Sequence, residues 1–163
     1  MKAYLSLVLV SWMVISVAAE PAPPQVRTFV REAGILRGNI ASADGVVTVC
    51  DSRMSRTPTY RSALESWQAR NQSLLSEAMA LEKRARSLVG PALSDERAAQ
   101  MDRDVLDNNR AKFLALNIRE ASEFCDRAEE SLRVPDGSFL FQVRTQLEIA
   151  KKAEQAMNGY VRK

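Results

Sequence analysis

Cys50 and Cys125 are the only two cysteines in this sequence of 163 residues. Cysteines of an exported chain pair because the compartment outside the cytoplasm is oxidising. A bond between them would close a loop of about 75 residues, for which chain entropy gives about 4.5 kcal/mol of stabilisation. We therefore predict one intramolecular disulfide, with a free buried thiol as the alternative.

The sequence contains no histidine. This excludes Ser-His and Cys-His nucleophilic triads, and zinc or haem sites with histidine ligands. The two cysteines are far apart, which argues against a C-x-x-C redox pair or a cysteine metal site, and there is no glycine-rich phosphate loop. We expect no cofactor and no metal.

Neighbouring carboxylates are the one remaining catalytic resource. Glu129 is adjacent to Glu130, and one residue separates Asp102 from Asp104. On a helix such neighbours do not converge on one point, whereas acid–base catalysis needs carboxylates that different elements hold in a cleft. We therefore predict that the protein is not an enzyme and has no catalytic residues.

Residues 1–19 have the pattern of a secretory signal. Lys2 precedes an apolar run, and Val17 and Ala19 are the small residues before the expected cleavage. An uncleaved anchor is the alternative, but the run is shorter than the roughly 20 residues of a membrane-spanning helix. The pattern predicts a periplasmic or secreted protein without a stable membrane span after cleavage.

Residues 20–24 form a proline-rich leader that we expect to be extended. Residues 25–163 are long enough for a single domain that buries roughly two thirds of its unfolded surface. The formal net charge of +3 is too small and too dispersed to indicate nucleic-acid binding. We expect another envelope or extracellular protein as the partner.

Residues 94–132 form the longest uninterrupted helical pattern, and we expect the other helices to pack around it. Ser94 can cap the first turn, with Asp95 and Glu96 at the positive end of the helix dipole. One row of this helix is apolar at steps of three and four residues, which predicts a buried face: Ala111, Leu114, Ile118, Ala121, Cys125, Ala128 and Leu132.

A second long helix is predicted from Thr57 and Pro58 to the stop at Gly90 and Pro91. The Gly-Pro link predicts that this helix runs antiparallel to the central helix, which brings Cys50 within reach of Cys125. Steps of four and three residues along it form a heptad seam: Tyr60, Leu64, Trp67, Asn71, Leu74, Ala78, Leu81, Ala85 and Leu88.

The first helix is predicted over residues 25–43, weakened by Gly34 and Gly38. Residues 46–49 are β-branched, yet no partner strand is evident, so we expect a short helix or an extended segment there. A turn at Pro135 precedes the last helix, which Ser138 can cap. That helix is expected to bury Leu140, Val143, Leu147, Ala150, Ala153, Met157 and Tyr160.

We therefore predict an all-α fold: an antiparallel four-helix bundle that is cross-linked by a Cys50–Cys125 disulfide. The first helix of this bundle can be irregular. Around the disulfide, we expect basic residues to face acidic ones and to orient the helices. The basic set is Arg53, Arg56 and Arg61, and the acidic set is Glu123, Asp126, Glu129 and Glu130.

Four residues of the second helix are candidates for partner binding or register. Asn71 is the polar residue of the seam and can fix register or partner choice, or lie at a loosely packed edge. Trp67 can be an interface anchor, although its place on the seam favours core packing. Arg84 and Arg86 suit the negative end of the helix dipole; the alternative is binding to an anion or a membrane surface.

The segment Leu93, Ser94, Asp95, Glu96 and Arg97 resembles the L-T-x-x-Q motif of the periplasmic Spy and CpxP helical chaperones, but with Ser and Arg at two of the three defining positions. The resemblance implies an extracytoplasmic chaperone or stress sensor, which is one alternative function; a secreted effector or ligand is another. The function that we expect first is non-enzymatic binding to another protein, as an adaptor.

Overall fold

The computed structural model describes residues 22–55, 58–89, 95–135 and 137–161. The predicted signal (1–19) and the predicted caps at Thr57 and Ser94 lie outside these residues. Within the described ranges the chain forms six helices and no strand. None of the described helices combines the length and the apolar character that crossing a membrane requires.

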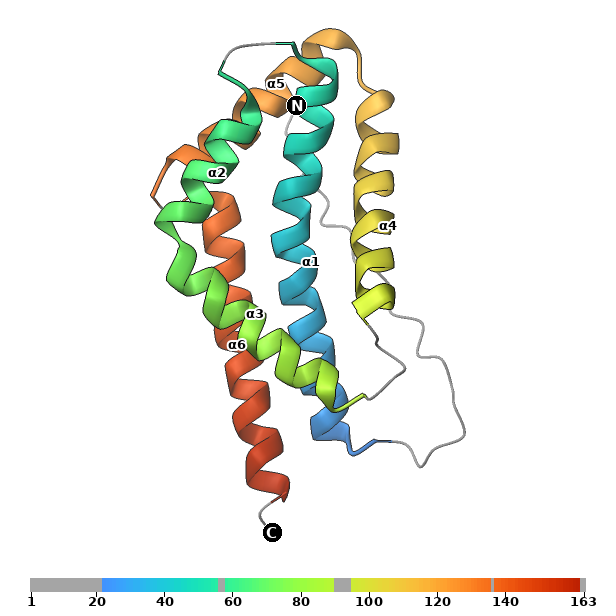
Figure 1. The fold of residues 1–163 in the computed structure, drawn as a ribbon, viewed down its shortest axis with the longest axis vertical. Coiled ribbons are helices and arrows are strands. Elements are labelled where there is room, and N and C mark those ends of the chain that lie inside the picture. Colours follow the sequence, from blue (N-terminus) through green and yellow to red (C-terminus); the bar gives the residue numbers. More distant parts are fainter. Residues whose placement is uncertain (1–21, 56–57, 90–94, 136, 162–163) are drawn as a thin grey trace, which may run out of the picture.

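Figure 1 shows the helices: α1 Pro24–Arg53, α2 Tyr60–Arg70, α3 Gln72–Ser87, α4 Asp95–Leu114, α5 Ile118–Arg133 and α6 Ser138–Val161. The all-α prediction is confirmed. The prediction of a four-helix bundle is not, because two of the predicted helices are each divided in two, giving six in the described residues.

Helix α1 is the centre of the structure, since each of the other five helices contacts it. In Figure 1 it runs between α4 on one side and α2 and α6 on the other, and α3 crosses in front of its lower part. The prediction that residues 94–132 form the central helix is therefore wrong. The first helix is continuous through Gly34 and Gly38 and extends beyond the predicted residue 43 to Arg53.

The β-branched run 46–49 lies inside α1. Among residues 43–50 only Asp44 is exposed, so this part of the helix is enclosed on almost every side. A helix that is apolar all round is stable when neighbours bury it, and this packing outweighs the preference of valine for strands.

The predicted helix 94–132 is broken between α4 and α5. The Leu116 amide donates to the Phe113 carbonyl, and Asn117 then caps α5 in a reciprocal capping box with Glu120. The break turns the first half of the predicted apolar row outward: Leu114 and Ile118 are 61% and 64% exposed. The second half, from Ala121 through Cys125 to Leu132, is buried as predicted.

The second predicted helix is divided at Asn71 into α2 and α3. It begins at Tyr60, after Pro58, and the cap comes from α1: the Asp51 carboxylate accepts from the backbone amides of Tyr60 (2.8 Å) and Arg61 (3.0 Å). The change of direction at Asn71 replaces Leu74 by Leu75 as the buried seam residue. The predicted pairing with the central helix is found only in part, because α2 packs on α5 whereas α4 packs on α1.

The predicted disulfide is confirmed. Cys50 in the last two turns of α1 is bonded to Cys125 in the middle of α5, with 5.7 Å between their Cα atoms. The contact does not depend on the predicted link at Gly90 and Pro91, because α1 itself carries Cys50 to α5.

Helix α6 packs along α1 and buries six of the seven residues predicted for it, from Leu140 to Met157. Tyr160 is 51% exposed, so that part of the prediction is wrong. The turn before α6 is confirmed by the Gly137 amide, which donates to the Val134 carbonyl. The Ser138 hydroxyl shares a hydrogen bond with that of Ser131 (2.7 Å).

We expect loss of the disulfide to lower the free energy of unfolding by up to about 4.5 kcal/mol, because the bond restricts a loop of 75 residues in the unfolded chain. Urea unfolding of the oxidised protein, the reduced protein and the double variant Cys50→Ala/Cys125→Ala measures this change. A loss below about 1 kcal/mol would contradict a stabilising role for the bond.

Two glycines of α1 form a matched pair. An added Cβ at Gly38 would meet no atom within 4 Å, so Gly38→Ala should stabilise the protein by about 0.5–1 kcal/mol. At Gly45 it would lie 3.1 Å from Asn109 Nδ2 and 3.7 Å from Leu106 Cα, so Gly45→Leu should destabilise it by about 1–3 kcal/mol. Thermal unfolding compares them; equal stability of Gly45→Leu and the parent would rule out close packing of α4 on α1.

Candidate functional site

A groove of about 200 Å³ lies between α1, α3 and α4. Ala41 and the fully buried Ala78 are its small residues, and the apolar side chains of Ile40 and Met79 flank them. Met79 is 58% exposed. The groove therefore offers apolar contact surface with one large side chain accessible to a partner.

Charged residues from all three helices surround this groove. Arg37 of α1 forms a bidentate pair with Asp102 of α4, through Nε–Oδ1 (3.1 Å) and Nη2–Oδ2 (2.5 Å). Its Nη1 lies 3.6 Å from Oε1 of the buried Glu82 of α3. Glu82 also pairs with Arg86 one turn later (2.8 Å). The two positive charges of the arginines match the two negative charges of the carboxylates. Their ion pairs connect the three helices.

Arg84 and Arg86, two of the predicted binding residues, both pair with carboxylates of this protein. Arg84 makes a bidentate pair with Glu154 of α6 (2.7 and 3.0 Å), and the hydrogen bond to Glu154 raises the pKa of Arg84 above its ordinary value. Both arginines lie in the last turn of α3, where cations suit the helix dipole. Their engagement with carboxylates does not favour the anion-binding alternative.

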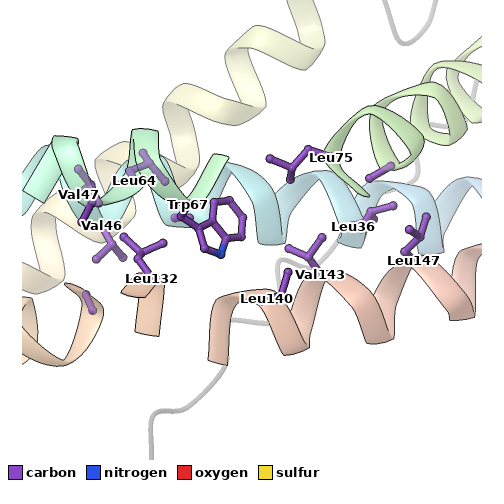
Figure 2. Packing of buried hydrophobic residues seen from close by; sticks show 14 of the residues in the cluster. Leu36, Val46, Val47, Leu64, Trp67, Leu75, Leu132, Leu140, Val143 and Leu147 are labelled. Carbon is purple, nitrogen blue, oxygen red and sulfur yellow. The ribbon is translucent and has the colours of Figure 1, made fainter. Parts of the chain in front are cut away.

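Trp67 and Asn71 are the other two candidates, and both have structural roles. Trp67 is 1% exposed; Figure 2 shows its indole among core side chains of other helices, including Leu132 of α5 and Leu140 of α6. The favoured reading of Trp67 as a core residue is therefore confirmed. Asn71 terminates α2, and its Nδ2 donates to the Trp67 carbonyl (2.8 Å), so Asn71 is not a register residue inside a continuous seam.

A second, more open hollow of about 410 Å³ lies at the end of α5, beside Asp126, Glu129 and Glu130. Arg133 lies at its edge and pairs with Glu129 (2.7 Å). Among the described residues no three His, Cys, Asp or Glu side chains converge in a way that could hold a metal ion. The hollow therefore lies beside the acidic end of α5, and its described carboxylates do not converge as metal ligands would.

The predicted opposition of basic and acidic sets around the disulfide is wrong for two of its three arginines. Arg53 donates to the Phe113 and Leu116 carbonyls (both 2.9 Å) and lies over the Phe113 ring, 5.3 Å from its centroid. Arg61 pairs with Asp44 and donates to Thr48 Oγ1 (2.7 Å). Arg56 lies outside the described residues.

The paired carboxylates considered for catalysis do not converge either. Asp102 is bound by Arg37, whereas Asp104 accepts from Gln100 (2.8 Å). One further buried carboxylate, Glu32 of α1, accepts from Gln146 Nε2 of α6 (2.9 Å) and so connects the two longest helices.

The cluster of Arg37, Glu82 and Asp102 was not predicted from the sequence. Glu82 and Arg86 have the four-residue spacing of a helical ion pair, and this signal was available. Arg37 and Asp102 are separated by 65 residues, and no local pattern connects them. Their meeting depends on α4 packing along α1.

We expect Arg37→Met to lower the free energy of unfolding by about 1–3 kcal/mol, because it removes one of the cations beside the buried Glu82. Arg84→Met is the matched control: Arg84 is half exposed, so its pair with Glu154 should contribute at most about 1 kcal/mol. Urea unfolding midpoints at constant slope measure both changes. Equal losses in the two variants would contradict a special role for the buried cluster.

Comparison with protein-family models, with curated proteins and with solved structures finds no match for this chain.

Proposed function

We propose that this protein is an exported, non-enzymatic helical adaptor that binds another envelope or extracellular protein. The observation that carries the proposal is the groove between α1, α3 and α4, which has small apolar residues inside and ion-paired residues around it. This arrangement is typical of a protein interface, in which an apolar contact is surrounded by polar groups that exclude water.

The size and charge of the groove favour an apolar side chain of a protein as its occupant. Its volume of about 200 Å³ is below the roughly 300–1,000 Å³ of pockets that hold small molecules. An anion is a poor candidate, because the Arg37 guanidinium is already engaged by Asp102 and Glu82. A Leu, Met or Phe side chain presented by a partner helix matches both properties.

An extracytoplasmic address is part of the same proposal. The disulfide between Cys50 and Cys125 is stable in an oxidising compartment, and the pattern of residues 1–19 predicts export. A general chaperone is less favoured, because a chaperone needs a sizeable continuous apolar surface. Here the exposed large apolar residues are distributed over several helices: Met79 and Leu88, Leu114, Ile118 and Val134, and Phe141, Ile149 and Tyr160.

A photo-crosslinking residue in place of Met79 tests the proposal in the native host. Ala80 is the matched control, because it is the next exposed residue of α3 and does not line the groove. We expect the Met79 probe to capture one recurring protein through an apolar side chain, and the Ala80 probe to miss it. The purified partner should then bind Ala41→Phe, which fills the groove, at least ~tenfold more weakly than the parent.

Three outcomes would overturn the proposal. Equal capture from both positions would mean that the partner does not bind specifically at the groove. Capture of many unrelated unfolded proteins, with suppression of their aggregation, would favour the chaperone. Unchanged affinity of a folded Ala41→Phe variant, with its disulfide intact, would place the binding surface elsewhere.

A further inference from the structure

We propose that the outer face of α6 binds the same face of a second copy of this chain, with the two α6 helices antiparallel. This surface lies on the side of α6 away from α1, and the groove proposed for the heterologous partner is built from α1, α3 and α4. The two surfaces can therefore be tested independently.

The outer face carries a heptad row that the core does not use. Its residues follow one another at alternating steps of four and three, and each of them is exposed: Phe141, Thr145, Glu148, Lys152, Gln155 and Gly159. The buried residues of α6, from Leu140 to Met157, occupy the opposite side of the helix. The helix thus presents a second row of exposed residues at heptad spacing, mostly polar and with Phe141 as its large apolar member.

This seam is complementary to itself when one copy is reversed. A two-fold axis at the level of Ala150 places Glu148 opposite the partner's Lys152, and Lys152 opposite the partner's Glu148. It also places Phe141, which is 67% exposed, opposite the partner's Gly159. An added Cβ at Gly159 would meet no atom within 4 Å, so the helix surface there is open to receive an aromatic ring.

Apolar residues beside the seam support the same register. Ile149 is 42% exposed and lies next to the axis, where it meets the partner's Ile149. Tyr160, 51% exposed, lies next to Gly159 and therefore beside the partner's Phe141. The reversed pair thus has apolar contacts at the centre and at both ends.

The charges of α6 select the antiparallel arrangement. A parallel pair in register would place Glu148 against the partner's Glu148 and Lys152 against the partner's Lys152, and like charges at an interface are costly. Among the described residues Lys152 makes no ion pair. Its neighbour Lys151 is engaged by Glu77 (2.5 Å) and Glu148 (3.0 Å), which raise the pKa of Lys151 above its ordinary value.

The expected dimer is weak. Helix α6 has 24 residues and is about 36 Å long, so a pair of such helices buries less than the roughly 1,600 Å² of a standard interface. Four of the six seam residues are polar, which lowers the affinity of the dimer further. The protein should therefore exchange between monomer and dimer as its concentration changes, and salt should favour the monomer.

Sedimentation velocity of the oxidised full chain tests this inference over a range of concentrations. Glu148→Lys and Lys152→Glu each place like charges across the axis twice, so each should raise the dimer dissociation constant at least ~tenfold. The double variant Glu148→Lys/Lys152→Glu restores both pairs with reversed charges and should recover the parent value to within about threefold. Glu65→Lys, an exposed change on α2, is the control and should have no effect.

Each outcome decides the proposal. Dimerisation that the single reversals weaken and the double reversal restores would support the antiparallel α6 pair. A parent protein that remains monomeric up to ~1 mM would overturn it, since weak specific contacts are populated at that concentration. A dimer that responds equally to Glu65→Lys, or that the double reversal does not restore, would also overturn it.

Discussion

The last turn of α1 connects three other helices, and the rest of the structure depends on this junction. Cys50 is bonded to α5, the Asp51 carboxylate caps the first amides of α2, and the Arg53 guanidinium binds one carbonyl in the last turn of α4 and one just after it. Backbone groups at helix ends have no partner within their own helix, and here neighbouring residues of α1 supply partners for two such ends. A covalent bond and two sets of charge-assisted hydrogen bonds therefore fix three helices relative to one.

The burial of α1 explains why this junction can form. A helix that contacts all the others must be apolar on several faces, and the valines before Cys50 provide that surface. The buried carboxylate of Glu32 enters this interior with a partner, because it accepts from Gln146 of α6. The shorter helices then follow the surface of α1, which is why the second and third predicted helices each change direction, at Asn71 and at Asn117.

The proposed binding groove is a consequence of the same arrangement. Because α3 and α4 both lie against α1, a shallow apolar space remains between them, and Arg37 of α1 reaches carboxylates on both sides of it. The charged cluster that holds the three helices is thus also the rim of the groove. The outer face of α6 lies away from this region and has no such cluster, which suits a weaker contact with a second copy.

The helical class, the pairing of Cys50 with Cys125 and six of the seven residues expected to be buried in the last helix could be predicted from the sequence. Helical periodicity and the number of cysteines are local or compositional properties, and a single sequence displays them directly. The spacing of Asn117 and Glu120 is also a local signal of a capping box. It was not used, because the apolar row continues through this position and favoured one unbroken helix. Tertiary packing set the central position of α1, the places where the long helices turn, and the contact of Arg37 with Asp102. These depend on which surfaces bury one another, and contacts between residues far apart in the chain leave no local pattern from which to predict them.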